Sequence, residues 1–365
     1  MNLLEEARIE INAVDKELAL LFEKRMRASE KVATYKKEHG LPILDAAREA
    51  AVIERGASLI EDEALRAYYV QFLKNIMQIS RAYQSRLLDG MRIAYCGTEG
   101  AFAHIACRKL FPDAAHVAFS DFERTYAAVE NGECDVCILP VENSSNGEVG
   151  QVTDLLFGGS LYVNGMFELA VSQDLLALPG AAAADIKTVI SHPQALGQCA
   201  DYIAAHGYEA KEFSNTALAA KWVAENGDRS FAAIASAEAA ELFGLCVLER
   251  NVNSAKNNTT KFVILSRVCH AHKSSEMGLH SILTFTVRNE AGALAKAIEV
   301  IGRHGFNMRT LRSRPMRKLL WQYYFYVEAE GNIDSPEGEI MLTELNAYCD
   351  RLKVLGTYIK SETER

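Results

Sequence analysis

The chain has 365 residues, 49% of them hydrophobic, and a formal net charge of −9, so it should hold two or three domains. Its acidity argues against general nucleic-acid binding, and no run is apolar and long enough to span a bilayer. The N-terminus is acidic where a signal peptide would be basic, so we expect a soluble, cytoplasmic protein with no membrane association.

Residues 3–37 predict one long helix, because apolar side chains recur at spacings of three and four and no Gly or Pro interrupts them. Such a helix is about 50 Å long, too long to be covered within one small domain, so we expect a second chain to pack along it. Arg25 lies on the apolar seam, where it requires an anion. Lys36 is nearly in phase with Arg25, whereas Arg8 lies roughly 25 Å away along the axis. A partner chain could therefore supply Arg8 to this site.

A second helix is predicted after Pro42, and a third from about residue 63 to residue 88. Polar side chains on the three helices resemble, as a set, the active site of the all-helical chorismate mutase family, over residues 1–89. The residues at family positions are Arg8, Arg25, Lys36, Asp45, Arg48, Glu49, Ser80 and Gln84. In that family the dimer is intertwined, and the first arginine comes from the partner.

The resemblance implies that chorismate rearranges to prephenate by a pericyclic shift, which needs neither proton transfer nor a nucleophile. The site must hold the reactive conformer and stabilise negative charge on the ether oxygen. By this resemblance, three arginines bind carboxylates, namely Arg8 of the partner, Arg25 and Arg48. The ether oxygen faces Lys36 and Gln84, the ring hydroxyl binds Glu49, and the orienting residues are Asp45 and Ser80.

From Gly90 onward, short β-rich runs alternate with helical stretches, which predicts an α/β domain with mostly parallel strands. The domain is long enough for two lobes, with a crossover near residues 164–178 and a return near Cys246. The expected strands are residues 92–96, 117–119, 136–139, 188–191, 209–213, 231–235 and 261–266.

Two of these strands adjoin polar stretches, residues 140–147 and residues 258–260, a position where α/β domains often present chemistry. These stretches resemble the Glu-Asn-Ser/Thr and Thr-Arg-Phe motifs of prephenate dehydratases, with Lys261 in place of the family's Arg. Residues 97–102 and 191–198 resemble further family segments. The resemblance implies that residues 91–268 form a two-lobed α/β dehydratase domain of the periplasmic-binding-protein type.

The family's reaction removes carbon dioxide and hydroxide from prephenate and yields phenylpyruvate. The resemblance makes Thr260 the essential residue, which hydrogen-bonds the departing hydroxyl, and Glu142 a candidate proton donor. Lys261 would bind a substrate carboxylate. The remaining substrate-binding residues would be Asn143, Ser144, Gln198 and Phe262.

After a polar linker at 269–278, residues 279–360 read strand, helix, strand, strand, helix, strand, which is a ferredoxin-like βαββαβ arrangement. The loop at 289–294 resembles the amino-acid-binding loop of an ACT regulatory domain. It implies an effector site formed by Asn289, Gly292, Ala293 and Leu294. Arg312 stands where the family has a glutamate, and this charge reversal predicts altered control by phenylalanine.

All three regions match, in order, the family of bifunctional chorismate mutase–prephenate dehydratases. The expected partners are chorismate and prephenate as substrates, phenylalanine as effector, and a second copy of the chain in a homodimer or larger assembly. Neither reaction requires a cofactor or metal, and neither is expected. Two alternatives stay open: a dehydratase that acts on arogenate, and a ligand-sensing protein without dehydratase turnover.

Overall fold

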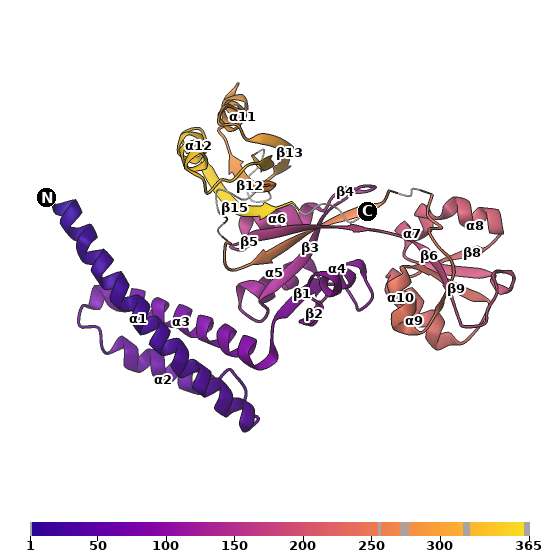
Figure 1. Cartoon of the computed structure of the whole chain (residues 1–365), viewed down its shortest axis with the longest axis horizontal. Helices are drawn as coiled ribbons and strands as arrows, with labels where there is room; N and C mark the ends of the chain where they lie inside the picture. Colours follow the sequence, from indigo (N-terminus) through magenta and orange to yellow (C-terminus); the bar gives the residue numbers. More distant parts are fainter. Residues whose placement is uncertain (1, 255–256, 271, 273–276, 317–321, 361–365) are drawn as a thin grey trace. The chain divides into compact units, whose positions relative to one another are not determined.

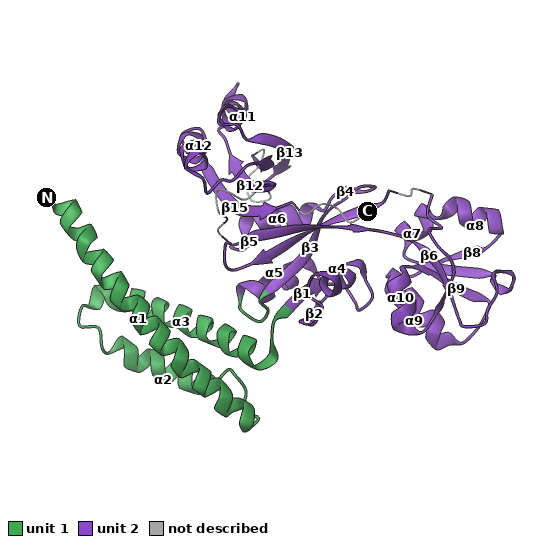
Figure 2. Ribbon diagram, viewed as in Figure 1, with its two compact units in different colours: residues 1–92, 131–135 green, residues 93–130, 136–365 purple. Residues whose placement is uncertain are grey.

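The computed structural model describes residues 2–254, 257–270, 272, 277–316 and 322–360 (Figure 1). Half of the predicted linker, residues 271 and 273–276, lies outside this part of the chain. The chain divides into two compact units, residues 1–92 with 131–135, and residues 93–130 with 136–365 (Figure 2). Within the described residues, no helix has both the length and the apolar character needed to cross a membrane.

The helical part of unit 1 confirms the three predicted helices, α1 (Leu3–Glu38), α2 (Ala46–Ala57) and α3 (Glu63–Asp89). Each helix begins at a polar cap, because the side chains of Asn2, Asp45 and Asp62 accept backbone N–H groups of the first turns.

The face of α1 that is buried within one chain differs from the predicted apolar seam. The buried residues of this helix are Met26, Ser29 and Ala33. Along the predicted seam, Ile11, Val14 and Leu21 remain 57%, 62% and 62% exposed. The two shorter helices cover only part of so long a helix, and a broad apolar stripe is left open.

The first lobe of unit 2 is built on a mixed sheet with strand order β2-β1-β3-β11-β5, and β4 pairs with β3. Strands β1 and β3 are parallel, whereas β11 is antiparallel to both β3 and β5. The strands are β1 (Arg92–Cys96), β2 (Ala115–Phe119), β3 (Val136–Asn143), β4 (Gly147–Glu148), β5 (Tyr162–Ala170) and β11 (Thr259–Ser266). Its helices are α4 (Phe102–Leu110), α5 (Phe122–Glu130) and α6 (Gly150–Gly158).

The second lobe has strand order β10-β6-β9-β7-β8. Its strands are β6 (Asp174–Ala177), β7 (Thr188–Ser191), β8 (Glu209–Glu212), β9 (Phe231–Ala235) and β10 (Cys246–Glu249). Its helices are α7 (Pro193–Gln198), α8 (Ala200–His206), α9 (Thr216–Asn226) and α10 (Ala237–Phe243), with a short 3-10 turn, η1 (Ala183–Asp185).

Most strands of each sheet run in one direction, as predicted, and one interior strand is reversed in each. In the first lobe β11 is antiparallel to β3 and β5, whereas β1 and β3 are parallel. In the second lobe β6 is antiparallel to β9 and β10, whereas β7 is parallel to β8 and β9.

The chain leaves the first lobe after β5 and returns in β11, so these adjacent strands run in opposite directions. For the same reason β6 and β10, which carry the chain into and out of the second lobe, are antiparallel. The outward crossover lies in the predicted region, and the return follows β10, which begins at Cys246, the predicted place, and ends at Glu249.

The C-terminal region, residues 279–360, has the predicted order of elements. These are β12 (Leu279–Thr286), α11 (Ala293–Arg303), β13 (Asn307–Pro315), β14 (Tyr323–Glu330), α12 (Pro336–Asn346) and β15 (Arg351–Ile359). The four strands form one antiparallel sheet in the order β13-β14-β12-β15. A core that includes Phe285, Val300, Val327 and Met341 lies between the sheet and the two helices.

The C-terminal region packs on the first lobe of unit 2. A Cβ atom at Gly356 of β15 would meet the carbonyl oxygen of Val163 on β5, so only glycine permits this close approach. Nearby, Lys353 Nζ donates to the carbonyl oxygens of Leu156, at 2.7 Å, and Gly159, at 2.5 Å, at the end of α6. Burial lowers the pKa of Lys353 to about 8.

Candidate active sites

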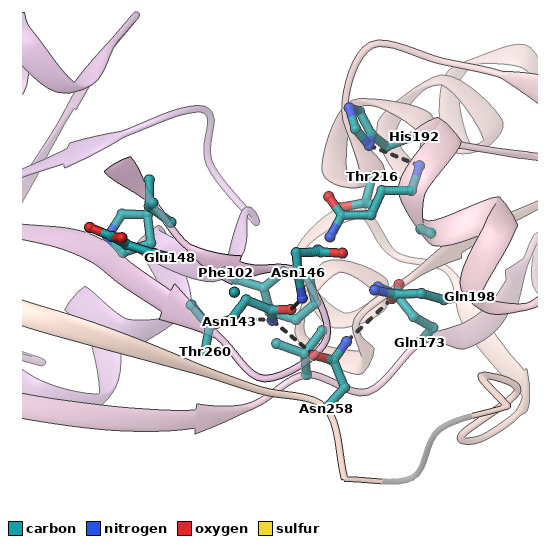
Figure 3. A pocket seen from close by; sticks show the side chains of 16 residues that line it. Phe102, Asn143, Asn146, Glu148, Gln173, His192, Gln198, Thr216, Asn258 and Thr260 are labelled. Carbon is teal, nitrogen blue, oxygen red and sulfur yellow. Dashed lines mark hydrogen bonds between the residues drawn. The ribbon is translucent and has the colours of Figure 1, made fainter. Parts of the chain in front are cut away.

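A cavity of about 350 Å³ lies between the two lobes of unit 2 (Figure 3). The first lobe and the segment before β11 contribute Phe102, Pro140, Asn143, Asn146, Gly147, Glu148, Val149, Asn258 and Thr260. The second lobe and the crossover segment contribute Val171, Gln173, His192, Gln194, Ala195, Gln198 and Thr216. Six amide and two hydroxyl side chains contribute to this lining beside apolar groups, which suits a ligand with several hydrogen-bonding groups on an apolar frame.

Asn143 organises the first-lobe side of the cavity. Its Nδ2 donates to Thr260 Oγ1 at 2.9 Å and to Asn258 Oδ1 at 2.8 Å (Figure 3). Its Oδ1 accepts the backbone N–H groups of Ser145 and Asn146, which holds the turn after β3. Asn143 and Thr260 are cross-strand partners of β3 and β11, so pairing of the two strands brings the two predicted residues together.

The second lobe contributes residues from the ends of its helices to the cavity. Asn258 Nδ2 donates to Gln198 Oε1 of the second lobe at 3.3 Å. His192 caps α7, because its Nδ1 accepts the backbone N–H of Gln194. Asn215 caps α9 and precedes Thr216, which lines the cavity. Gln198, which was predicted to bind substrate, lines the cavity.

Two predicted site residues, Glu142 and Lys261, do not line the cavity. They are cross-strand partners next to Asn143 and Thr260, and successive residues of a strand point to opposite faces. Lys261 Nζ lies 4.0 Å from Glu168 and 3.9 Å from Glu328 of the C-terminal region. Glu142 forms an ion pair with Arg312 at 2.6 Å. The geometry therefore gives no support to Glu142 as a proton donor in the cavity or to Lys261 as a carboxylate ligand.

Two further predicted site residues, Phe262 and Ser144, are not among the residues that line the cavity. Phe262 is 2% exposed within the sheet. Ser144 Oγ accepts the backbone N–H of Thr259 at 2.9 Å and joins the turn after β3 to the start of β11. A β-bulge lies next to these residues. Phe262 pairs with Pro140 while Lys261 pairs with Glu142, so β3 carries Val141 as an extra residue.

Several cavity residues were not among the predicted site residues, namely Phe102, Asn146, Gln173, His192, Gln194, Thr216 and Asn258. Most follow the end of a strand or precede a helix, and this position is the sequence signal that could have identified them. Glu148 also lines the cavity, but its carboxylate points away from the amides of Asn143, Asn146 and Asn258 (Figure 3).

In unit 1, the structure brings together Arg25, Ser80 and Gln84. The guanidinium of Arg25 donates to Ser80 Oγ and to the carbonyl oxygen of Ile76, and burial lowers the pKa of Arg25. Gln84 is 7% exposed, and its Oε1 has no hydrogen-bond partner among the described residues. A part-buried guanidinium and a buried amide oxygen without a partner are groups that a polar, anionic ligand would satisfy.

The other predicted mutase residues are more dispersed. Lys36 Nζ donates to the carbonyl oxygen of Ile43, and Glu49 is paired with Arg81. Asp45 caps α2 through the backbone N–H of Arg48, whose side chain is exposed. Arg8 is exposed near the start of α1.

A second cavity, of about 480 Å³, lies in the C-terminal region. Two of the predicted effector residues, Asn289 and Leu294, line it, together with Arg288 and Asp350, whose charged groups lie 3.9 Å apart. Gly292 adopts a φ of 81° and caps α11, and Ala293 begins that helix. Arg312 is not part of this cavity, because its guanidinium extends to Glu142 of the first lobe.

Two family models match separate regions of the chain. A model of the prephenate dehydratase family matches residues 93–270, and a model of chorismate mutase type II matches residues 7–85. Among solved structures, one described as GqqA, a novel type of quorum quenching acylase, is 34% identical, with a TM-score of 0.69, and covers 75% of this chain and 100% of its own. The prephenate dehydratase of Arthrobacter aurescens, in complex with L-Phe, is 24% identical with a TM-score of 0.67, and covers 74% and 90%.

Relatives that match nearly the whole chain carry both regions. The bifunctional chorismate mutase/prephenate dehydratase of Enterobacter agglomerans is 32% identical over 96% of this chain and 94% of its own. The protein of the same description from Aquifex aeolicus is 29% identical over 99% of both chains. The two matched regions lie in the order expected from the sequence, and the chain belongs to the family of bifunctional chorismate mutase/prephenate dehydratases.

Proposed function

We propose that the cavity between the lobes binds prephenate and that Thr260 donates a hydrogen bond to the departing hydroxyl. The observation that carries this proposal is the bond from Asn143 Nδ2 to Thr260 Oγ1. Because the Thr260 oxygen accepts there, its own proton is free to be directed to another acceptor. Asn143 thus orients Thr260 for donation to a leaving oxygen.

The reaction is balanced by one proton. The bond to the ring carboxylate breaks and releases carbon dioxide, its electron pair completes the aromatic ring, and the C–O bond breaks toward the hydroxyl. The leaving hydroxide takes up a proton and departs as water. The amides of Asn146, Gln198 and Asn258 line the cavity and can donate hydrogen bonds to substrate carboxylates, whereas both N–H groups of Asn143 are used within the site.

The likeness to an acylase raises acyl transfer as a second candidate, and the surroundings of Thr260 argue against it. A threonine nucleophile needs a neighbouring base that removes its proton. The neighbour that contacts Thr260 Oγ1 is the amide nitrogen of Asn143, which is a donor and no base. This contact suits donation by Thr260 better than nucleophilic attack.

In unit 1, chorismate binds at Arg25, Ser80 and Gln84, with Lys36, Asp45, Arg48 and Glu49 completing the site and Arg8 supplied by a second chain. The exposed apolar stripe of α1 is the surface on which that chain packs. The part-buried guanidinium of Arg25 binds a substrate carboxylate, and Gln84 faces the ether oxygen. The support for this assignment is the buried polar groups of Arg25 and Gln84 together with the open stripe.

The C-terminal region is an ACT regulatory domain whose 480 Å³ cavity binds phenylalanine. Support comes from the loop that contains Asn289 and Leu294 and from the nearby opposite charges of Arg288 and Asp350, which match the carboxylate and ammonium of an amino acid. Since Arg312 lies outside this cavity, its charge does not act on the ligand by direct contact.

The test is to incubate purified protein with chorismate and to measure prephenate and phenylpyruvate over time. A bifunctional enzyme forms prephenate first and phenylpyruvate after it. Arogenate supplied in place of prephenate separates the two dehydratase alternatives, since turnover of arogenate alone would contradict the proposal. Binding without any product would instead favour a ligand sensor.

A further inference from the structure

Two arginines of β13 extend from the C-terminal region to the first lobe of unit 2. They are two residues apart and therefore point to the same face of the strand. Arg312 Nη2 lies 2.6 Å from Glu142 Oε1. Arg314 contacts Asp154 of α6 with two hydrogen bonds, of 3.0 and 3.2 Å, and lies 3.7 Å from Glu148 Oε1.

The two glutamates that these arginines contact are direct cross-strand partners in the β3–β4 hairpin. Like charges directly opposite each other destabilise an antiparallel pair, and these two side chains are only 34% and 22% exposed. One guanidinium at each glutamate offsets that repulsion. The β3–β4 hairpin therefore relies on Arg312 and Arg314 of β13 to neutralise the two glutamates.

The same hairpin carries Asn143, which follows Glu142 and hydrogen-bonds Thr260 in the cavity. On the next strand, Lys261 follows Thr260 and lies between Glu168 and Glu328 of the C-terminal region. The cavity pair Asn143 and Thr260 is therefore flanked on the opposite face of the sheet by the pair Glu142 and Lys261, and each of the latter contacts the C-terminal region.

We propose that Arg312 is a positioning residue for the dehydratase site, which holds the β3–β4 hairpin and thereby the Asn143–Thr260 hydrogen bond. This inference rests on the proposed dehydratase cavity. A glutamate at position 312, as the resemblance expects, would place a third carboxylate beside Glu142 and Glu148. The arginine supplies the opposite charge, and Tyr326 supports it, with the guanidinium carbon 6.0 Å from the ring centroid.

The position of Arg312 also predicts which kinetic constant changes. Arg312 does not line the cavity, so its loss removes no substrate contact. Displacement of the hairpin misorients Thr260 instead. The hydrogen bond from Thr260 to the departing hydroxyl, which is made in the transition state, is then weakened. The expected signature is a lower kcat for prephenate with little change in KM.

The experiment is a charge exchange across this ion pair. Arg312→Glu should lower the dehydratase kcat on the order of tenfold, with KM within about twofold, since contacting pairs couple by this much. Glu142→Arg should do the same, and the double variant Arg312→Glu with Glu142→Arg should recover most of the loss. Arg312→Lys, which keeps the charge, should stay close to wild type.

Arg309→Glu is the matched control. It reverses a charge on the same strand, but its partner Glu330, 2.6 Å away, belongs to the C-terminal region itself. Its kcat should match that of wild type, and the mutase rate of every variant, measured in the same preparation, reports on the integrity of the chain.

A wild-type kcat for Arg312→Glu, or a double variant as slow as the single ones, would overturn the positioning role. The double variant also tests a direct role of Glu142, because a catalytic carboxylate could not be replaced by arginine. Failure of the proposed function has a different outcome, in which the wild-type protein forms no phenylpyruvate from prephenate.

Discussion

Thr260 and Lys261 are neighbours in the sequence, and their side chains have different surroundings. Thr260 lines the cavity and accepts a hydrogen bond from Asn143, whereas Lys261 lies on the opposite face of the sheet among carboxylates. The same alternation separates Asn143 from Glu142 on β3. At the scale of the residue, neighbouring polar side chains on β3 and β11 therefore face opposite sides of the sheet, and only Asn143 and Thr260 of these four line the cavity.

Thr260→Val keeps the shape of the side chain and removes the hydroxyl. We expect the dehydratase kcat to fall by about 10²- to 10³-fold, the usual loss when one donor to a developing oxyanion is removed. The mutase rate of the same preparation should be unchanged. Thr343→Val, an exposed position on α12, controls for the substitution itself. Near wild-type dehydratase turnover in Thr260→Val would exclude Thr260 as the donor.

Gln84→Leu separates function from stability in unit 1. The buried Oε1 of Gln84 has no partner among the described residues, which is costly in the free protein. We expect the mutase kcat to fall by about 10²-fold or more while the thermal midpoint stays equal or rises. Calorimetry and a chorismate assay on the same sample check both. A large fall in the midpoint would mean that Gln84 stabilises the fold.

At the scale of the element, α11 and α12 are joined by a titratable cluster. His304, at the end of α11, contacts Glu344 at 2.8 Å and Glu337 at 2.6 Å. Hydrogen bonds to Glu344 and then Glu337 raise the pKa of His304 above its ordinary 6.5. A group whose pKa is raised on folding stabilises the folded state fully below its unfolded pKa.

This stabilisation is lost as the pH rises from 6.5 through the raised pKa of the folded state. Wild type should therefore lose stability over that interval relative to His304→Gln, in which the two carboxylates face a neutral amide. Thermal midpoints measured between pH 5.5 and roughly pH 8.5 give the comparison. His206→Gln, which alters a ring that contacts the carbonyl oxygen of Tyr202, should keep the wild-type slope. Parallel curves for wild type and His304→Gln would contradict the assignment.

At the scale of the whole molecule, α1 presents an apolar face that one chain leaves open. Leu4, Ile11, Val14 and Leu21 are all more than half exposed. Arg8 lies seventeen residues before Arg25, roughly 25 Å along the helix, too far for one small ligand to contact both in a single chain. Both observations favour a mutase site completed by a second copy.

Mixing Arg8→Ala with Arg25→Ala protein tests this site across chains. After subunit exchange, a mixed dimer carries one site with both arginines and one with neither. About a quarter of wild-type mutase activity is expected for random exchange of two equally stable variants, because half of the dimers are mixed. Exchange is verified with differently tagged chains. Activity no higher than that of either parent, despite proven exchange, would show that each site is formed by one chain.

The sequence by itself determined the helices of unit 1, seven strands of unit 2 and the order of elements in the C-terminal region, but it did not predict β4, β5, β6 or β10. Three helices of unit 1 and the βαββαβ order of the C-terminal region follow from local periodicity, because amphipathic spacing and caps act within a few residues. The motifs around Asn143 and Thr260 lie inside strands that are longer than predicted, since β3 extends to Asn143 and β11 begins at Thr259.

Only the tertiary structure decided which face each side chain takes and what it meets there. A bulge at Val141 and the pairing of β3 with β11, more than a hundred residues apart, set the phase that directs Asn143 and Thr260 to the cavity. The same pairing directs Glu142 to Arg312, a residue that sequence reasoning assigned to an effector site. The pairing register decides which face of the sheet each side chain points to, and it depends on segments that are distant in the sequence. The same is true of the partner that a long charged side chain meets, so no local pattern contains this information.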